Sequence, residues 1–553
     1  MIQKVETAMR LQLFLAAALV CLALIEPVTA GPYAAPATYY NSATGTGATL
    51  KTQLRSIVSS MTGVNYGNAR YSAPYTDGDP NASGNILLIY NRASVSSTWD
   101  SGGTWNREHI WPVSRLGVSD PGNSTTNLSS DQFNLRPANP SINSSRGNKP
   151  FGMDSTTGGF GHQGSYYFPG DSDAGDVARA QFYMATRYSQ LTLTDGSPSG
   201  TQMGDLSSLL NYHYRDVPDE FEQRRNHAIY GLAGENSPAI ANPHRQSNRN
   251  PYVDRPEFVW SVFMDQENDT RLSLDGAVVD GNGGSAKLVN LGRAIVGAPQ
   301  PTSAQIVVNK SGLDGTYYEI STAGHAASSK EGRYNAFTMG ATGSASIDVG
   351  MNVDSSAAGL YSGTVTIDNL DVTAQGGAGR GANDADDVVA LEYRVLEHAT
   401  PSFSDAGLAN SFTYDFGMVP AGSTPTFSFN LSNLAGASGY TAGLDLDSIL
   451  GVGDVGNFTT DLQTFGGLET LTAGSSRAFN ASINTSSPGV FTASYQLRFS
   501  DENLLGAVDL GVMTLTLSGI VGVPEPASIG LILIGLCGLR AMGANRRTRH
   551  GRN

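Results

Sequence analysis

The sequence pattern of this chain changes near residue 271, and this change limits most strongly what the chain can fold into. Before it, apolar residues recur at helical spacing in segments such as 175–188. After it, short runs of Val, Ile, Thr, Tyr and Phe, as in 304–308 and 513–517, are separated by Gly, Ser, Asn and Asp. The chain has 553 residues, whereas single domains usually stop growing at about 250–300. We therefore expect a multidomain protein in which an α+β domain precedes all-β sandwich modules.

These patterns divide the chain into parts. Residues 31–270 hold most of the helical signal, including a second helical pattern after Asp219, and all four tryptophans, so we expect the enzymatic domain here. Further β-type runs stand at 362–367 and 494–499. The expected parts are a signal peptide at 1–30, an α+β domain at 31–270, a β-rich module at 271–395, a β-sandwich module at 396–520 and a C-terminal tail at 521–553.

The N-terminus has the layout of a cleavable secretory signal. Lys4 and Arg10 precede an apolar run at 11–25, and the small-residue end at 28–30 precedes Gly31. The alternative is an N-terminal membrane anchor, but the apolar run is shorter than the roughly 20 residues that a spanning helix needs. We therefore expect an exported protein.

The C-terminus has three parts. The sequence Val-Pro-Glu-Pro-Ala-Ser at 523–528 precedes an apolar stretch at 529–539 and a basic cluster. This arrangement resembles the bacterial PEP-CTERM sorting signal. The resemblance implies that the tail holds the chain at the cell envelope and that a dedicated transpeptidase removes it. The alternative is a plain transmembrane anchor, because positive residues after an apolar segment stay cytoplasmic. The basic residues are Arg540, Arg546, Arg547, Arg549 and Arg552.

Only two cysteines occur, Cys21 in the expected signal and Cys537 in the tail. A mature chain without them has no disulfide, which is ordinary for large exported domains with adequate cores. The body of the protein therefore has no cysteine nucleophile and no zinc–cysteine site. It also lacks a His-Glu-x-x-His pattern, which argues against a metalloprotease.

The formal net charge of −15 is unusual for a protein that handles nucleic acid, because phosphate binding normally requires a basic surface. The charge is unevenly spread. Residues 31–270 contain 17 Lys and Arg against 22 Asp and Glu, a net of −5, whereas residues 271–523 contain 10 against 24, a net of −14. The acidity belongs mainly to the β-type half, so it does not exclude a phosphodiester substrate in the first half.

The adjacent pair Glu108-His109 supplies groups that phosphodiester hydrolysis requires, namely a base that activates water and a ligand for a charge-neutralising cation. If the pair lies on a β-strand, its side chains point to opposite faces, and one site for both would require a bend or bulge. The segment 131–152 that follows is rich in amides and cations. Pro137 and Pro140 are suited to start a helix that carries Asn143, whose amide oxygen could bind a hard metal ion.

Several ordered blocks together resemble the bacterial endonuclease I family. They are 105–112 (Trp-Asn-Arg-Glu-His-Ile-Trp-Pro), 134–138 (Asn-Leu-Arg-Pro-Ala), 142–148 (Ile-Asn-Ser-Ser-Arg-Gly-Asn), 175–179 (Gly-Asp-Val-Ala-Arg), 219–226 (Asp-Glu-Phe-Glu-Gln-Arg-Arg-Asn) and 250–257 (Asn-Pro-Tyr-Val-Asp-Arg-Pro-Glu). The resemblance covers roughly residues 50–265. It implies a histidine-metal finger nuclease, in which two strands and a helix (ββα) carry the catalytic groups.

Carried over residue by residue, the resemblance implies that His109 is the general base and that Glu108 and Asn143 bind Mg²⁺ or Ca²⁺. The implied activity is cleavage of DNA, and often RNA, with little sequence preference. Some family members hold a phosphate-contacting Arg in a longer insertion that this chain lacks. Arg115, Arg136 or Arg146 could take that role, and the sequence does not rank them.

Phe133 stands where a His is common in the family, and we expect it to pack in the core. We expect His162, His213, His227 and His244 to be surface or packing residues.

The sequence thus predicts an exported, metal-dependent endonuclease, secreted or held at the cell envelope. The competing hypothesis from another class is a non-catalytic envelope or adhesive protein built on the β modules. Hydrolysis of another kind of phosphodiester is a third possibility. The intact Glu108-His109 pair and Asn143 favour the nuclease.

Overall fold

The structure is a computed structural model of the chain. It describes residues 31–152, 159–264, 270–313, 315–338, 340, 342–370 and 384–522. The expected signal peptide lies outside these residues, as does the expected tail beyond Gly522. None of the helices in the described ranges is long and apolar enough to cross a membrane.

The chain divides into two compact units. The first contains the described residues up to Leu291 together with Thr302–Asn352 and Ser362–Glu392. The second contains Gly292–Pro301, Val353–Tyr361 and the described residues from Tyr393 onward. Each unit is therefore built from segments that are separated in the sequence.

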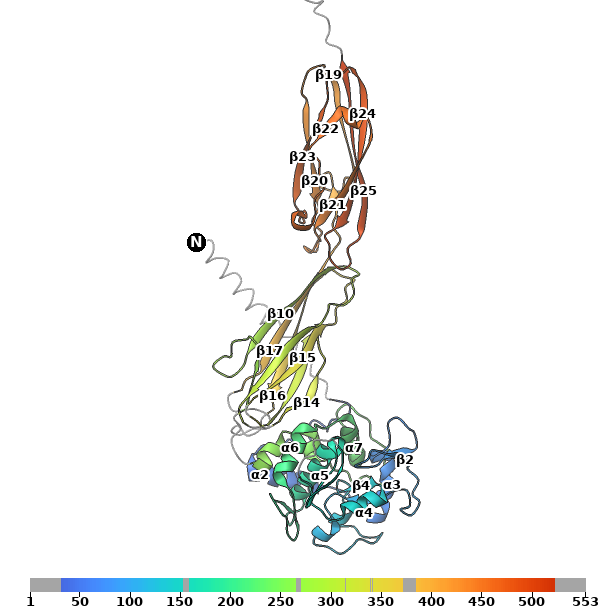
Figure 1. The fold of residues 1–553 in the computed structure, drawn as a ribbon, viewed down its shortest axis with the longest axis vertical. Coiled ribbons are helices and arrows are strands. Elements are labelled where there is room, and N and C mark those ends of the chain that lie inside the picture. The colour runs from blue at the N-terminus through green and yellow to red at the C-terminus, as the bar shows by residue number, and fades with distance from the viewer. Residues whose placement is uncertain are drawn as a thin grey trace, which may run out of the picture. The chain divides into compact units, whose positions relative to one another are not determined.

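Helices and short strands alternate in the first half of the chain (Figure 1). The helix predicted at 175–188 is confirmed as α5, Ala174–Arg187. The helix predicted after Asp219 is also confirmed, as α7. Asp219 fixes its start, because its side chain accepts a hydrogen bond from the Glu222 amide at 2.8 Å. The helices are α2 (Gly47–Ser59), α3 (Tyr66–Thr76), α4 (Pro140–Arg146), α5, α6 (Leu206–Arg215), α7 (Glu220–Tyr230) and α8 (Pro251–Asp254). The strands are β1 (Asn85–Leu87), β2 (Ser94–Ser96), β3 (Asn106–His109), β4 (Leu135–Ala138), β5 (Gly161–Gln163), β6 (Tyr166–Phe168), β7 (Thr192–Leu193) and β8 (Gln202–Met203).

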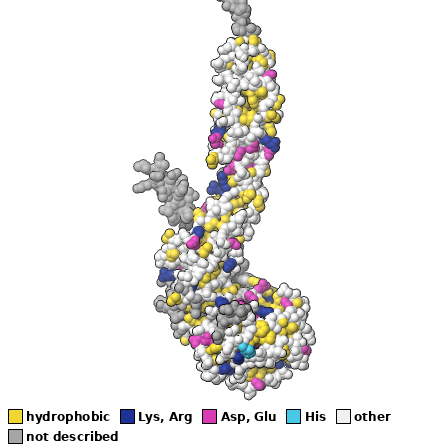
Figure 2. Space-filling model, viewed as in Figure 1, with side chains coloured by type: hydrophobic (Ala, Val, Ile, Leu, Met, Phe, Trp, Pro, Cys, Tyr) yellow, Lys and Arg dark blue, Asp and Glu magenta, His cyan; other side chains and the backbone are white. Residues whose placement is uncertain are grey.

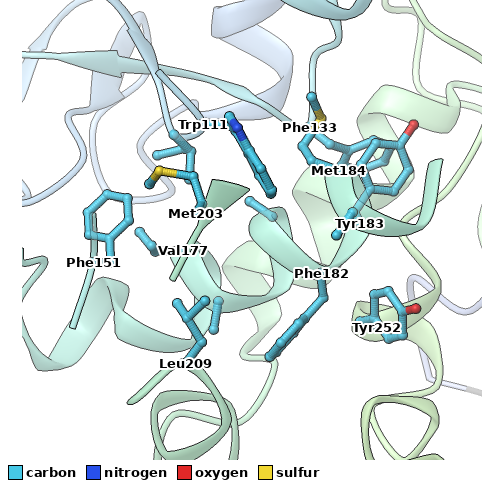
Figure 3. Packing of buried hydrophobic residues seen from close by; sticks show 14 of the residues in the cluster. Trp111, Phe133, Phe151, Val177, Phe182, Tyr183, Met184, Met203, Leu209 and Tyr252 are labelled. Atoms are coloured by element: carbon cyan, nitrogen blue, oxygen red, sulfur yellow. The ribbon is translucent and has the colours of Figure 1, made fainter. Parts of the chain in front are cut away.

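Helix α5 is the centre of the core in this half. Every residue from Ala174 to Thr186 is buried, and side chains from the surrounding elements pack around the helix (Figure 3). Trp111, Phe133 and Tyr252 belong to the same buried cluster. Burying one such large side chain contributes about 1.5–3 kcal/mol. The expectation that Phe133 is a packing residue is confirmed, since it is 3 % exposed and its ring centroid lies 4.5 Å from that of Tyr183.

From residue 271 onward the described chain is almost entirely β-structure, as the alternating runs predict. Two sheets form between residues 271 and 396, one with the order β10-β17-β16-β12-β14 and one with the order β13-β15-β11-β9. The strands are β9 (Arg271–Leu274), β10 (Ala286–Ile295), β11 (Ala304–Ser311), β12 (Thr316–Gly324), β13 (Ala326–Ser328), β14 (Gly332–Phe337), β15 (Thr342–Met351), β16 (Gly359–Asn369) and β17 (Asp387–Leu396).

The last described part forms two four-stranded sheets, with the orders β18-β20-β23-β22 and β19-β25-β24-β21. One buried cluster takes residues from both sheets, including Phe429 of β20 and Leu497 of β24, so the sheets pack face to face as a sandwich. The strands are β18 (Pro401–Ser402), β19 (Ser411–Pro420), β20 (Thr426–Asn433), β21 (Leu444–Gly453), β22 (Phe458–Thr460), β23 (Ser476–Ile483), β24 (Gly489–Asp501) and β25 (Asp509–Gly522).

Candidate active site

Two short strands and a helix bring the predicted site residues together. Strand β3 pairs with β4 in antiparallel register, with Glu108 opposite Arg136. Helix α4 follows β4 at once. The Asn139 side chain caps this helix by accepting hydrogen bonds from the amides of Ser141 and Ile142. Pro140 occupies the first helical position, where its missing N–H is not needed. Pro137, the other proline expected to start the helix, lies instead in β4.

A buried guanidinium fixes α4 against β3. Arg146, at the end of α4, is 1 % exposed, and its Nη1 donates to Glu108 Oε1 at 3.1 Å and to the His109 carbonyl at 2.9 Å. Its Nη2 donates to the Ile110 carbonyl at 2.8 Å. One side chain thus holds the helix that carries Asn143 on the strand that carries Glu108 and His109.

Glu108 lies on the inner side of β3 and is 2 % exposed. Its Oε1 accepts a hydrogen bond from the Tyr90 hydroxyl at 2.7 Å in addition to the bond from Arg146. Burial raises the pKa of Glu108, and the positive charge of Arg146 opposes that rise. Tyr90 has a φ of 76°, which is rare for a bulky residue, and its amide is held by Asp173 at 2.8 Å. The carboxylate is therefore placed by a strained residue that the surrounding structure keeps in position.

His109 points to the other side of the strand, as the alternation of a strand requires. Its Nε2 lies 2.8 Å from the Ser129 carbonyl oxygen. A carbonyl oxygen only accepts, so Nε2 carries the proton and Nδ1 keeps the lone pair. Burial lowers the pKa of His109 to about 4. The imidazole is therefore neutral near pH 7 and can accept a proton at Nδ1.

Two further contacts define the surroundings of His109. The Tyr66 ring stacks on the imidazole, with centroids 5.4 Å apart and planes 20° apart. The Ser129 carbonyl is oriented by a short 3₁₀ turn, in which the Asn127 side chain accepts from the Ser129 amide at 2.9 Å. The imidazole plane and its tautomer are thus both fixed by the fold.

Asn143 lies on α4 with a half-buried side chain. Its Nδ2 donates to Asn106 Oδ1 at 2.8 Å, which leaves its Oδ1 without a hydrogen bond from the part of the chain that the structure describes. No group of three or more His, Cys, Asp or Glu side chains in the described ranges could hold a metal ion. A carboxylate with an amide oxygen is a sparse donor set, which suits Mg²⁺ because that ion keeps several waters.

The structure separates the three arginines expected as phosphate contacts. Arg136 and Arg146 are 5 % and 1 % exposed, and both are enclosed by carboxylates and carbonyls, so neither reaches a phosphate in this conformation. A direct phosphate contact by either residue stays a prediction, and their burial argues against it. Arg115 is half-buried and donates to the carbonyls of Asn148 and Pro198, and its phosphate role stays a prediction.

Arg136 belongs to a buried network of charges. Its Nε contacts Asp77 at 2.8 Å and its Nη1 contacts Asp176 at 3.0 Å. Arg225 shares Asp77 at 3.3 Å and donates to the Leu135 carbonyl at 2.7 Å. The two carboxylates outweigh burial and raise the pKa of Arg136, which stays charged. This network holds β4 to α3, α5 and α7.

The other histidines divide into packing and surface residues. His213 and His227 are fully buried, and their Nε2 atoms lie 2.9 Å from the carbonyls of Pro256 and Pro238. Burial lowers the pKa of both. His162 is exposed and His244 is half-buried. The expectation that these four residues pack or lie at the surface is confirmed.

Sequence analysis did not identify three residues that contact the predicted site residues. Tyr90 holds Glu108, Tyr66 stacks on His109, and Asn106 orients Asn143. Asn106 lies in the recognised block 105–112, and strand alternation placed it on the same face as Glu108. Tyr66 and Tyr90 lie outside the blocks that carry the resemblance, so no sequence signal pointed to them.

Comparisons with known proteins agree with this geometry. The Endonuclease I family matches residues 46–257. Extracellular ribonuclease of Bacillus subtilis (strain 168) is 37 % identical over 260 residues, which cover 44 % of this chain and 83 % of the relative. Extracellular ribonuclease of Bacillus amyloliquefaciens is 37 % identical over 251 residues, which cover 42 % and 80 %. The CupB6 tip adhesin from Pseudomonas aeruginosa aligns over 47 % of this chain and 100 % of its own with 11 % identity, but the TM-score of 0.19 is too low to establish a shared fold.

The fold and these relatives define a nuclease, an enzyme of the hydrolase class. They favour the enzyme over the non-catalytic envelope protein. More specifically, the chain belongs to the endonuclease I family. Its relatives are extracellular nucleases, which agrees with export of this chain.

The burial of Arg136 predicts that this residue stabilises the fold. Stability measurements can distinguish this role from a role in substrate binding. Arg136→Ala leaves Asp77 and Asp176 without their partner, and breaking a buried ion pair in this way costs about 3–5 kcal/mol. We expect that loss in urea unfolding followed by tryptophan fluorescence. Arg115→Ala, the matched control, should cost less than about 1 kcal/mol. Equal stability of the two variants would contradict the structural role.

Proposed function

We propose that this protein is an exported, divalent-metal-dependent endonuclease that hydrolyses phosphodiester bonds of DNA and RNA with little sequence preference. The observation that carries the proposal is the hydrogen bond from His109 Nε2 to the Ser129 carbonyl. It leaves a neutral imidazole whose Nδ1 has no hydrogen-bond partner among the described residues, and a buried carboxylate is the preceding residue of the same strand. A general base next to a metal-binding carboxylate is the combination that phosphodiester hydrolysis requires.

In this proposal His109 takes a proton from the attacking water at Nδ1. Ser129 fixes the tautomer, and the stacked Tyr66 ring keeps the imidazole from rotating. The β3-β4-α4 unit would then be a histidine-metal finger, with His109 on one side of β3 and the metal ligands on the other. General-base catalysis of this kind contributes typically 10²–10⁴-fold.

Glu108 and Asn143 would hold the metal ion, Mg²⁺ or Ca²⁺. The donor set fits: Glu108 is a buried carboxylate, and Asn143 offers an amide oxygen without a hydrogen-bond partner in the described ranges. When bound, the ion would stabilise negative charge on the phosphate and on the leaving oxygen. Tyr90 and Asn106 orient these two ligands, so the chain itself fixes the distance between base and metal site.

RNA as well as DNA is proposed as substrate because both relatives are named extracellular ribonucleases. Arg115 remains the proposed phosphate contact, since it is the accessible one of the three predicted arginines. Figure 2 shows charged side chains of both signs interspersed on the visible face of the helical part, without one continuous basic patch. Phosphate binding would therefore rest on individual cations such as Arg115 rather than on a basic patch.

We further propose that residues 31–270 form the catalytic domain and that 271–395 and 396–520 are separate β modules. The sequence of the tail at 521–553 supports attachment to the cell envelope until a sorting transpeptidase removes it. The site would then act outside the cytoplasm, where extracellular nucleic acid is degraded.

The first test is digestion of plasmid DNA and of RNA by the exported chain and by His109→Ala. We expect cleavage by the wild type with Mg²⁺ and a loss of about 10²–10⁴-fold in the variant, because the base is removed. Its thermal transition should stay close to that of the wild type. His162→Ala, which removes an exposed histidine, is the control and should cleave normally. Full activity of His109→Ala would contradict the assignment.

The metal site has a separate test. Asn143→Ala removes an amide oxygen from the proposed donor set but leaves His109 in place, so we expect cleavage to require a higher Mg²⁺ concentration. Isothermal titration of Mg²⁺ into the chelator-treated protein should show the weakened binding directly. Ser144→Ala, an exposed neighbour on α4, is the matched control. An unchanged Mg²⁺ requirement in Asn143→Ala would remove this residue from the site.

A further inference from the structure

Aromatic rings and guanidinium groups alternate in a row that begins beside His109. The guanidinium of Arg107 lies over the face of Tyr66, 3.6 Å from its centroid, and the other stacking partner of Tyr66 is the His109 ring. Arg107 also donates to the Tyr66 carbonyl. The row therefore starts in direct contact with the proposed base.

The row continues outward through three more side chains. Arg107 lies 5.3 Å from the ring centroid of Trp99, and Arg70 lies 5.6 Å from the same ring. Arg70 also lies 4.7 Å from the ring centroid of Tyr71, whose side chain is 46 % exposed. We call Tyr66, Arg107, Trp99, Arg70 and Tyr71 the stacking row. It leads from His109 to the protein surface.

Local structure explains why these residues meet. Tyr66 and Arg70 are four residues apart on α3, so they share one face of the helix. Asn65 starts this helix by capping it, with its side chain accepting from the Asn68 amide at 2.7 Å. Arg107 comes from β3, on the face opposite Glu108. The row thus combines one helix face with the strand that carries the base.

The two arginines of the row have no acidic partner among the residues that the structure describes. Neither Arg70 nor Arg107 forms a salt bridge within the described ranges, and the Nε atom of each is buried without a hydrogen-bond partner there. Arg136 and Arg146, in contrast, are paired with carboxylates. Asp120 is close enough to influence the pKa values of Tyr66 and His109, but it pairs with neither arginine of the row.

We infer that the stacking row is a binding subsite for single-stranded nucleic acid, and this inference rests on the proposed nuclease function. The exposed ring of Tyr71 and the half-buried ring of Trp99 offer aromatic surface to the faces of unpaired bases, and the two arginines of the row bind the phosphates between those bases. In a duplex those base faces are covered by neighbouring base pairs. The row therefore selects unpaired strands and delivers the next phosphate to His109.

Binding can be measured with cleavage disabled. The protein would be the full chain with His109→Ala. The single-stranded probe would be a fluorescein-labelled oligo(dT) of about eight nucleotides, a length within the usual site size for such strands. The duplex probe would be a labelled hairpin with the same number of phosphates. Fluorescence anisotropy should show that Tyr71→Ala and Trp99→Leu each weaken binding of the single strand by roughly 5- to 100-fold, from the usual contribution of one stacked base. Duplex binding should change less than about twofold.

Tyr75→Ala is the matched control. Tyr75 lies on the same helix and is 36 % exposed, and no guanidinium of the described residues lies over its ring. It should bind both oligonucleotides like the parent protein. Equal losses in Tyr71→Ala and Tyr75→Ala, or equal losses for single strand and duplex, would overturn the subsite. Cleavage by the wild type is measured separately. If the wild type does not cleave but His109→Ala still binds the single strand selectively, the nuclease function is refuted and the binding subsite is retained.

Discussion

The site depends on one buried guanidinium. Arg146 contacts the Glu108 carboxylate and the carbonyls of His109 and Ile110 at the same time. Because it belongs to α4, it determines where Asn143 lies relative to Glu108. The buried ring of Phe151 packs against this guanidinium, with its centroid 4.3 Å from the central carbon of Arg146. Arg146, one of the three arginines predicted to contact phosphate, thus holds together the elements that carry the predicted site residues.

Buried charges recur throughout the helical half of the chain. Arg136, Arg179 and Arg249 are each enclosed and each paired with a carboxylate. Such pairs contribute little net stability, but losing one partner is costly, so they make the arrangement of helices specific. Arg70 and Arg107, which form no salt bridge within the described ranges, belong to the stacking row that begins at Tyr66 beside His109. They differ in this respect from the buried arginines that hold the fold.

The sequence predicted the elements whose signal is local. Helix α5 follows from the spacing of its apolar residues, and the β-type runs from their alternation. Glu108 and His109 could be proposed as site residues because they lie within one short block of the chain. Asn143 could be proposed in the same way, because it lies within another block.

Contacts between distant segments were not predictable from the sequence. The partner of Arg136 is Asp77, 59 residues earlier, and nothing in the residue types tells a buried arginine from an exposed one. Tyr90 reaches Glu108 only because its backbone adopts a positive φ. We predicted that, if Glu108 and His109 lie on a β-strand, a bend would be needed for both side chains to serve one site. The two side chains lie on opposite sides of β3, and Arg146 connects them by bonding to the carboxylate of one and the carbonyl of the other.

The central claim is that the His109 imidazole is the general base, and chemical rescue tests it most directly. In His109→Gly the space left beside Tyr66 and Ser129 should admit added imidazole. We expect Mg²⁺-dependent plasmid cleavage to return in proportion to the concentration of unprotonated imidazole, with no effect on the wild type. Cleavage by His109→Gly that is already at the wild-type rate, or that imidazole does not restore although the protein is folded, would contradict the claim.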